Sequence, residues 1–339
     1  MSRRRGRWVP RLAVLAFLVA ALAAGAVLWS VFTPYQGFRN EAFVDIAKGT
    51  SVRAIAGEMA GNGAVRSRWQ FLAVRLLRPS ARLQAGEYRF SHADSAWNIF
   101  DRLVRGDVFY YELTVPEGSN MFDIAGVVNQ LGFLSGAEFL KAARNPALMR
   151  DMAPAAPTLE GFLFPSTYRL TRQTTVHQLC RMMTGEFRKQ WREMEAPPGA
   201  DVERLVTMAS MVEKETAVDA ERAEVASVYY NRLDRGMALD CDPTTIYAAL
   251  LEERYRGTIY RSDLASTNAY NTYTHTGLPP GPITNPGAAS LRAALHPAST
   301  GYLYFVARPD GSGSHQFSSD LAAHNRAVEQ YRNGTRHRR

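Results

Sequence analysis

Two glutamates, Glu213 and Glu215, flank Lys214 in the sequence VEKET, within a segment whose other residues are mainly apolar. A carboxyl group beside a buried helix face can have its pKa raised by partial desolvation, and such a group can act as a general acid near neutral pH. A glutamate at the edge of an apolar helix face is more commonly a solvated surface residue. Periodicity alone leaves both interpretations open.

The elements that must position these glutamates are predicted to be two helices. Asp201 is a preferred N-cap residue, and apolar residues follow it at helical spacing as far as the glutamates. At about 100° per residue, Glu213 and Glu215 border the apolar face on opposite sides, so at most one of them can lie at the centre of a given cleft. A second helix is predicted to begin at Asp219 and to stop at Gly236.

The composition is that of an ordinary folded protein with basic tails. The chain has 339 residues, of which 46% are hydrophobic and 21% charged, enough for two or more domains. The net charge is +8, but nine arginines lie in residues 1–11 and 332–339, and without them it falls to −1. A nucleic-acid groove needs cations on a folded face, so no nucleic-acid partner is predicted.

The histidines and cysteines predict no metal site, because no HExxH or CxxC spacing occurs. Cys180 and Cys241 are the two cysteines of the chain. They could pair in an oxidising compartment, and the sequence does not decide whether they do.

Residues 12–32 form a run of 21 residues without a charged side chain. As a helix this run would be ~31 Å long, which matches the hydrocarbon core of a membrane. The arginines of residues 1–11 precede it, so the positive-inside rule predicts a cytoplasmic N-terminus and an exported body, anchored in the inner (cytoplasmic) membrane. A cleaved signal peptide is the alternative, but its apolar region is usually only ~7–15 residues long. We therefore predict a retained single-pass anchor.

An internal repeat follows the anchor. Residues 46–65 align without a gap on residues 115–134, and each copy predicts a strand, a Gly turn, a Thr or Ser N-cap and a short helix. Residues 85–107, between the copies, predict another strand and helix. The recurrence can reflect only a good helix start, or it can reflect a resemblance to the LysM module, which binds glycan chains of cell walls. On the second interpretation residues 38–150 form a LysM-like α+β region.

The remainder of the chain, residues 158–331, is predicted to be a mixed α/β domain that contains both glutamates. Residues 151–158 are rich in Pro and Ala and predict a linker before it. Residues 301–307 predict a strand and residues 321–331 a helix, and residues 332–339 predict a disordered basic tail. The predicted fold class is therefore α+β, with a transmembrane helix, a LysM-like subdomain and a C-terminal mixed α/β domain.

Several segments in register resemble the YceG-like family of membrane-anchored endolytic murein transglycosylases. They are LVTMASMVEKETAVDAERAEVASVYYNRLDRGMALDCDPTTIY, YNTYTHTGLPPGPITNPG, HPA, YLYFVA and SSDLAAHN. The anchor, the LysM-like region and EGFLFPSTY match too, so the resemblance covers nearly the whole chain. It implies cleavage within peptidoglycan glycan strands, at the β-1,4 bond that follows N-acetylmuramic acid, with 1,6-anhydro ends as products.

The resemblance maps the catalytic glutamate of the family to the sequence EKE. We place it on Glu215, which is nearer the centre of the apolar face, with Glu213 as the alternative. Glu215 would protonate the glycosidic oxygen and then, as a carboxylate, accept the proton of the muramoyl C6 hydroxyl group that attacks C1. Since one carboxylate serves both steps, a second acid at the roughly 5–9 Å spacing of other glycosidases is not required.

Five further residues are candidates for substrate binding. Tyr270, Asn271 and Tyr273 lie in a loop where aromatic rings could pack on sugar rings and the amide could bond hydroxyl groups. The same three residues could equally serve as a cap and as partial core. Asp242 either caps a helix or orients the site, and Glu160, before an aromatic–Pro turn, is ambiguous in the same way.

The resemblance also suggests partners. It implies peptidoglycan glycan strands as the substrate and a membrane around the anchor, and the family suggests cell-wall synthases as protein partners. No cofactor is implied, because the sugar supplies its own nucleophile. Two alternatives stay open: a hydrolase that uses water on the same substrate, and an anchored glycan-binding scaffold without turnover.

Overall fold

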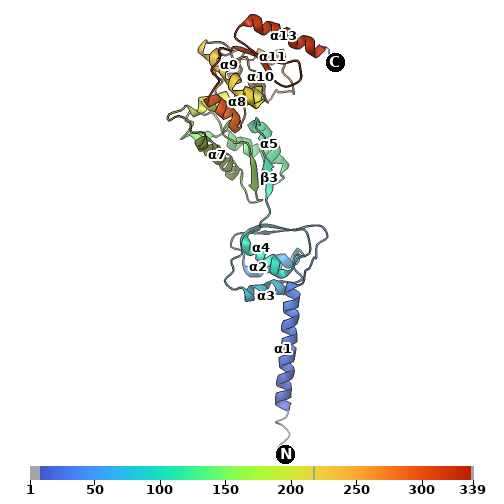
Figure 1. The fold of residues 1–339 in the computed structure, drawn as a ribbon. Helices are drawn as coiled ribbons and strands as arrows, with labels where there is room; N and C mark the ends of the chain where they lie inside the picture. Colours follow the sequence, from blue (N-terminus) through green and yellow to red (C-terminus); the bar gives the residue numbers. More distant parts are fainter. Residues whose placement is uncertain (1–7, 217, 337–339) are drawn as a thin grey trace, which may run out of the picture. The chain divides into compact units, whose positions relative to one another are not determined.

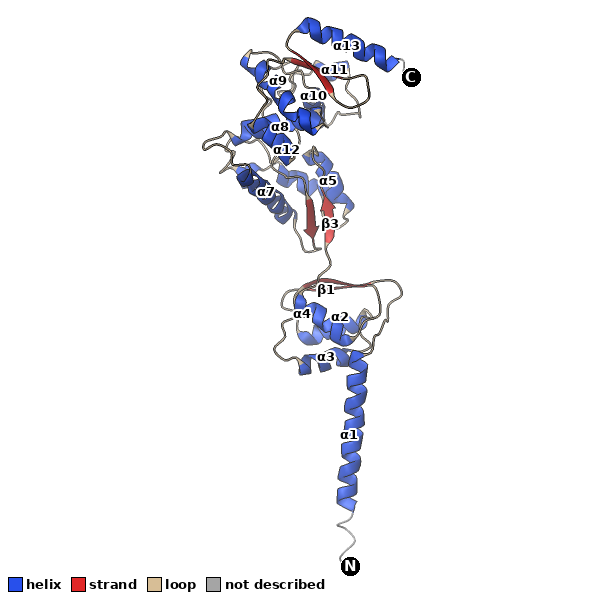
Figure 2. Cartoon of the chain, viewed as in Figure 1, coloured by secondary structure: helices blue, strands red, loops and turns tan. Residues whose placement is uncertain are grey.

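A computed structural model describes residues 8–216 and 218–336 of the chain. The chain divides into two compact units, Met1–Tyr111 with Leu170–Arg172 (unit 1), and Glu112–Arg169 with Gln173–Arg339 (unit 2). Helices and short two-stranded sheets build both of them (Figure 1, Figure 2). The predicted α+β class is confirmed.

The first part of the chain is an apolar helix followed by strand–helix units. Its elements are α1 (Trp8–Phe32), β1 (Ala42–Ile46), α2 (Val52–Gly61), α3 (Arg68–Leu77), β2 (Gly86–Phe90) and α4 (Ala96–Arg105).

The second part contains the segments predicted to carry the chemistry. Its elements are β3 (Tyr111–Thr114), α5 (Met121–Gln130), α6 (Gly136–Ala143), η2 (Pro146–Met149), β4 (Thr167–Leu170), α7 (Val176–Glu193), α8 (Val202–Glu215), η3 (Asp219–Glu221), α9 (Arg222–Asp234), α10 (Asp242–Leu251), α11 (Arg261–Leu264), α12 (Ala288–Leu295), β5 (Tyr304–Ala307), β6 (His315–Ser318) and α13 (Leu321–Arg336).

Helix α1 contains the predicted span, since Leu12–Phe32 is 21 residues long with a mean hydropathy of 2.5. Its side chains are largely exposed, as expected for a helix that meets lipid rather than protein. The last turn differs, because Val31 is fully buried and the Phe32 ring lies 5.2 Å from the Trp97 ring of α4. The helix therefore runs into the core of unit 1 without an intervening linker.

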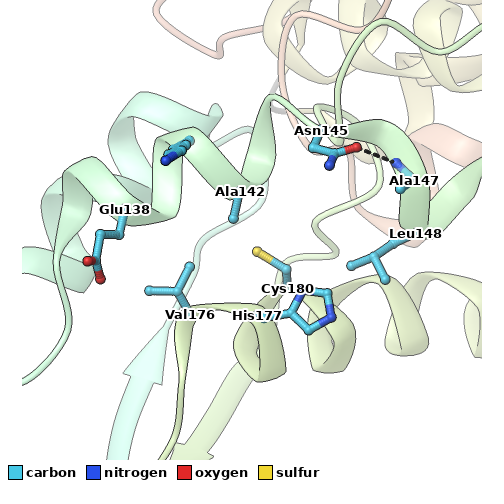
Figure 3. A pocket seen from close by; sticks show the side chains of 9 residues that line it. Glu138, Ala142, Asn145, Ala147, Leu148, Val176, His177 and Cys180 are labelled. Atoms are coloured by element: carbon cyan, nitrogen blue, oxygen red, sulfur yellow. Dashed lines mark hydrogen bonds between the residues drawn. The ribbon is translucent and has the colours of Figure 1, made fainter.

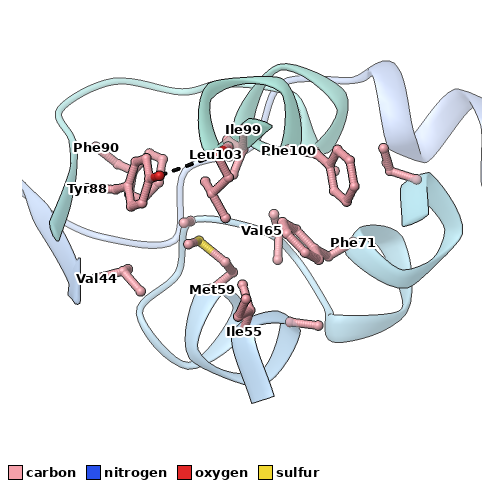
Figure 4. Packing of buried hydrophobic residues seen from close by; sticks show 14 of the residues in the cluster. Val44, Ile55, Met59, Val65, Phe71, Tyr88, Phe90, Ile99, Phe100 and Leu103 are labelled. Atoms are coloured by element: carbon pink, nitrogen blue, oxygen red, sulfur yellow. Dashed lines mark hydrogen bonds between the residues drawn. The ribbon is translucent and has the colours of Figure 1, made fainter. Parts of the chain in front are cut away.

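The core of unit 1 lies between the antiparallel pair β1–β2 and helices α2, α3 and α4 (Figure 4). Alternation in β1 sends every second side chain inward, and Val44 of β1 pairs with Tyr88 of β2. The Tyr88 hydroxyl donates a hydrogen bond to the Gln84 carbonyl at 2.9 Å, which satisfies the one polar atom of this buried ring. Phe71 and Phe100 pack against each other at 5.1 Å.

The two copies of the repeat have the predicted local structure, but they fall in different units. Gly49 and Gly118 adopt φ values of +86° and +74° before helices α2 and α5, a conformation that favours glycine. Ser51 caps α2, one residue after the predicted Thr50. The second cap is Asn120 rather than the predicted serine, because Asn120 and Asp123 form a reciprocal capping box. The LysM-like region at 38–150 coincides with neither unit and stays a prediction.

Unit 2 corrects two predictions about loops. The predicted linker at 151–158 lies inside the unit, where Ala153 and Ala156 are buried and the Leu159 amide donates to the Ala143 carbonyl at 2.7 Å. The linker prediction is therefore wrong. The small Ala side chains allow this turn to pack closely against the rest of the unit. The predicted disordered tail is also wrong for residues 332–336, which belong to α13, while residues 337–339 lie outside the described residues.

Gly132, near the end of the second repeat, allows a test of why glycine occurs at positions with positive φ. It adopts a φ of +75°, and an added Cβ would meet nothing within 4 Å, so only backbone strain opposes a side chain there. We predict that Gly132→Ala lowers the free energy of unfolding by about 1–2 kcal/mol, and that Gly132→Asn costs less because Asn tolerates this conformation. Thermal unfolding of the two variants measures the difference.

The matched control is Gly126, a helical and exposed glycine of α5 whose added Cβ also meets nothing within 4 Å. Gly126→Ala should raise stability by roughly 0.5–1 kcal/mol, because alanine favours the helix. A loss of stability in both alanine variants would show that crowding, not backbone conformation, governs these positions.

Candidate active site

Helix α8 carries the two candidate glutamates in its last turn. The Asp201 side chain accepts a hydrogen bond from the Arg204 amide at 3.0 Å, so the helix begins where the sequence predicts. Its apolar face is buried, and the two carboxyl groups contact different parts of unit 2. The helix that follows begins with the turn η3 at Asp219 and leads into α9, close to the predicted start.

Glu215 ends α8 with a carboxyl group that is largely removed from water, although the residue is partly exposed. Burial raises the pKa of Glu215, and hydrogen bonds from the Cys241 thiol and the Tyr229 hydroxyl partly offset this rise. The charge of Asp242 also raises the pKa, whereas His315 lowers it. The hydrogen bond from the Tyr229 hydroxyl to Glu215 Oε1 is 2.9 Å long. The net effect is a raised pKa for Glu215, which favours the protonated form of its carboxyl group.

The two donors beside Glu215 are themselves buried. Burial raises the pKa of both the Tyr229 hydroxyl and the Cys241 thiol well above their ordinary values, so both are protonated donors at neutral pH. Tyr229 comes from the inward face of α9, and the Phe305 ring of β5 meets it edge-on at 6.1 Å. Cys241 is the N-cap residue of α10. Three elements therefore place hydrogen-bond donors and apolar cover around one carboxyl group.

Glu213 makes a different set of contacts. Its Oε2 accepts a hydrogen bond from the Gly287 amide, the N-cap residue of α12, at 2.9 Å. Its Oε1 lies 3.6 Å from the Arg222 guanidinium group, and both side chains are buried. Arg222 also donates to the Ser290 hydroxyl at 3.0 Å. Glu213 therefore ties α8 to α9 and to the positive end of α12, where the helix dipole favours a carboxylate.

The loop of the second repeat reaches this junction. Gly118 lies where an added Cβ would be 3.5 Å from the Glu213 side chain, and a Cβ on Gly287 would collide with the Glu117 carboxylate. The Gly118 amide donates to the Asn285 carbonyl at 3.0 Å. Both glycines thus allow a close approach of three segments that are far apart in the sequence.

Asp242 and Tyr273 come together beside Glu215. The Tyr273 hydroxyl donates to Asp242 Oδ1 at 2.7 Å, and burial together with this carboxylate raises the pKa of Tyr273. Asp242 is the first residue of α10 and is close enough to Glu215 to raise its pKa. The Tyr273 ring is 38% exposed and so remains available for contact with a ligand.

Tyr270 and Asn271 lie in the interior of the same loop. Asn271 is fully buried, and its Nδ2 donates to the carbonyl groups of Leu264 and Ser266 at 3.0 and 2.8 Å. The Tyr270 ring packs on the Tyr247 ring at 5.1 Å. These contacts organise the loop, and a direct contact of the two residues with substrate stays a prediction.

Glu160 is fully buried and links three segments of unit 2. Its Oε2 accepts from the Met121 amide at 2.8 Å and its Oε1 accepts from Asn285 Nδ2 at 2.7 Å. Burial raises the pKa of Glu160 to about 8, although these bonds and one from Tyr247 oppose the rise. Its predicted role in substrate binding stays untested, and its geometry is that of an internal support.

Sequence analysis missed three neighbours of Glu215, namely Tyr229, Cys241 and His315. His315 begins β6, and its Nδ1 lies 2.8 Å from Glu221 Oε2, while its backbone amide donates to Glu221 Oε1 at 2.9 Å. All three residues are in or beside the segments that carry the family resemblance, which was the available signal. Periodicity could not find them, because they approach Glu215 from separate elements.

A separate pocket of unit 2 contains none of the candidate residues (Figure 3). It lies between α6, η2 and α7, and is lined by Glu138, Lys141, Ala142, Asn145, Ala147, Leu148, Val176, His177 and Cys180. Cys180 and Cys241 are both buried and unpaired. Within residues 8–216 and 218–336, no cluster of three His, Cys, Asp or Glu could hold a metal ion.

The fold, the repeat and the EKE helix define a class of protein that comparison identifies. Residues 44–330 match the model of the YceG-like family, and the chain belongs to this family, as the sequence resemblance predicted. It is 32% identical over 307 residues to the endolytic murein transglycosylase of Bacillus subtilis, covering 85% of this chain and 84% of that protein.

Two further proteins that the chain matches are consistent with this family. The endolytic murein transglycosylase of Streptococcus pneumoniae is 27% identical over 359 residues, covering 94% of this chain and 65% of that protein. The crystal structure of a yceG-like protein from Listeria monocytogenes matches with a TM-score of 0.53 and 30% identity, covering 85% of this chain and 99% of that chain.

The buried Glu160 generates a prediction about pH. In the unfolded chain this carboxyl group ionises near its ordinary pKa of 4.5, whereas in the folded chain it keeps its proton up to about pH 8. Its contribution to stability is therefore fully present below about pH 4.5 and is lost as the pH rises through about 8. Relative to Glu160→Gln, the parent protein should lose stability on the order of 1 kcal/mol per pH unit over this range.

Thermal unfolding of both proteins at a series of pH values measures this slope. Glu138→Gln, which changes an exposed glutamate of α6, is the control and should leave the slope unchanged. Parallel curves for the parent protein and Glu160→Gln would mean that Glu160 is ionised in the folded state.

Proposed function

We propose that the chain is an endolytic peptidoglycan lytic transglycosylase, which cleaves the β-1,4 bond between N-acetylmuramic acid and N-acetylglucosamine within glycan strands. Membership of the YceG-like family and the names of the two bacterial relatives support this reaction class. The observation that carries the proposal is the desolvated carboxyl group of Glu215, with its raised pKa and its two neutral donors.

In the proposed mechanism Glu215 acts first as an acid and then as a base. The protonated carboxyl group gives its proton to the glycosidic oxygen as the bond to C1 breaks, and positive charge develops on the sugar. The resulting carboxylate accepts the proton of the muramoyl C6 hydroxyl group while that oxygen bonds to C1 and closes the 1,6-anhydro ring. Glu215 ends the cycle protonated, so one carboxyl group suffices and water does not take part.

Tyr229 and Cys241 support the intermediate stage of this cycle. When Glu215 has given up its proton, its carboxylate lies in a place with little water, where a hydrogen bond to a charged group is strong. The Tyr229 hydroxyl at 2.9 Å and the Cys241 thiol supply such bonds. They stabilise the carboxylate enough for it to form, while burial raises the pKa of the resting group and so favours its protonated form.

The remaining candidates have supporting roles in this proposal. Glu213 holds α8, α9 and α12 together through Gly287 and Arg222, and is the alternative acid. Tyr273, half-exposed and bonded to Asp242, is the aromatic surface on which a sugar ring would pack.

Helix α1 supports a proposal for the location of the reaction. Its length and hydropathy suit a membrane anchor, and the arginines before it favour a cytoplasmic N-terminus. We propose that the chain is a single-pass protein of the cytoplasmic membrane, with both units on the outer side, where nascent glycan strands are exposed. Cell-wall synthases are the protein partners that this location suggests.

The central test replaces the proposed acid. Glu215→Gln keeps the shape of the side chain but cannot donate or accept the catalytic proton, so the rate should fall by about 10²–10⁴-fold. Mass spectrometry of products from purified glycan strands measures the anhydro-ended fragments. Full activity in this variant would remove Glu215 from the mechanism.

Glu213→Gln is the matched control on the same helix. Loss of its contacts with Arg222 should lower the thermal midpoint, while anhydro-ended products persist. The reverse pattern, with activity lost only in Glu213→Gln, would transfer the acid to Glu213. Products with only reducing ends would identify a hydrolase, and no cleavage by the parent protein would identify a binding scaffold.

Tyr229→Phe tests the hydrogen bond to Glu215. This bond lowers the pKa of Glu215, so its loss should raise that pKa further and move the alkaline limb of the pH–rate profile to higher pH. The rate near neutral pH should fall by roughly 10-fold, because the carboxylate formed in the reaction loses a charge-assisted bond. An unchanged profile would show that the Tyr229 hydroxyl does not act on the reacting carboxyl group.

A further inference from the structure

Helix α3 of unit 1 exposes a row of large apolar side chains. Trp69 is 65% exposed, Leu76 is 81% exposed and Leu77 is 53% exposed. Trp69 and Leu76 are seven residues apart, which is about two helical turns, so they lie on one face. The opposite face buries Phe71 and Val74 in the core of the unit. Such a surface on a folded unit is typical of a contact with something other than water.

Hydrogen bonds tie α3 to the end of α1. The Gln70 amide donates to the backbone carbonyl and the hydroxyl of Ser30, at 2.9 and 2.8 Å. Figure 2 shows α3 at the end of the unit from which α1 extends. Because Val31 is buried in the same core, the last turn of α1 and helix α3 share one packed structure.

These bonds fix the depth of α3 relative to a membrane around α1. If the apolar run to Phe32 fills a hydrocarbon core of about 30 Å, Ser30 lies within its last turn. Its partner Gln70 must then lie at the membrane surface, and so must its neighbour Trp69. Trp29 of α1, 69% exposed, lies at the same level. Indole rings are enriched in this interfacial layer.

The charges of α3 suit the same surroundings. The helix contains no acidic residue. The Arg68 guanidinium group lies 4.9 Å from the Trp69 ring, and that of Arg66 lies 5.0 Å from the Tyr35 ring. Both arginines are exposed. An arginine beside a tryptophan in the membrane interface presents its positive charge to anionic lipid headgroups.

We propose that α3 is an interfacial helix that docks unit 1 on an anionic lipid surface through Trp69, Leu76 and Leu77. The inference rests on the proposed insertion of α1 and goes beyond it, because a membrane anchor alone does not require a second contact with lipid. The occupant is lipid and not another protein, because the bonds to Ser30 place this face beside the bilayer.

Fluorescence of the full chain in nanodiscs of phosphatidylethanolamine and phosphatidylglycerol tests this contact. The difference between the parent protein and Trp69→Phe gives the emission of Trp69. Lipids brominated near the headgroup end of their chains should quench this emission at least about two-fold. The emission of Trp191, obtained in the same way from Trp191→Phe, should be unquenched, since Trp191 is buried in unit 2. Equal emission of Trp69 with and without bromine would overturn the proposal.

Trp29→Phe separates this inference from the anchor. Quenching of Trp29 without quenching of Trp69 would leave α1 in the membrane and overturn the docking of α3 on lipid. The exposed face of α3 would then be a contact for another protein. Absence of quenching at both positions would overturn the anchor and the docking together.

A second variant tests the leucines without altering the reporter. Leu76→Ser combined with Leu77→Ser should reduce the bromine quenching of Trp69 at least about two-fold, with an unchanged circular dichroism spectrum. Leu321→Ser is the matched control, because Leu321 is 54% exposed on α13 of unit 2. Unchanged quenching in the double variant would show that the leucines do not hold α3 on the lipid.

Discussion

The constraint on which the rest of unit 2 depends is the removal of the Glu215 carboxyl group from water. A carboxyl group stays protonated near neutral pH only if burial outweighs the donors around it. Tyr229 from α9 and Cys241 from the start of α10 supply these donors, and Phe305 of β5 covers Tyr229. Helices α8, α9 and α10 and the β5–β6 hairpin together enclose the Glu215 carboxyl group, and their contacts determine its pKa.

The other buried carboxyl groups hold the enclosure in place. Glu213 joins α8 to Arg222 and to the amide of Gly287, and Glu160 joins the Met121 amide to Asn285. The loops that they connect are far apart in the sequence, and strands between them are few. Hydrogen bonds and an ion pair from Glu213 and Glu160 therefore fix these loops, in place of a large sheet.

Local features could be predicted from the sequence, and contacts between distant segments could not. The Asp201 cap, the apolar face of α8 and the opposite directions of Glu213 and Glu215 follow from spacing along one helix. The partners Tyr229 and Cys241 do not, because each lies on another element with its own period. The linker prediction at 151–158 failed for a related reason, since composition describes flexibility but not which turns are packed against a core.

The direct passage of α1 into unit 1 has a practical consequence for any soluble fragment. Val31 fills the core and Phe32 packs on Trp97, so these two residues of the apolar run belong to the folded unit as well. A fragment cut after the run would leave a hole where Val31 lies, and the bond from Gln70 to Ser30 would be lost. The boundary between the apolar run and the folded unit therefore lies inside the last turn of the helix, not after it.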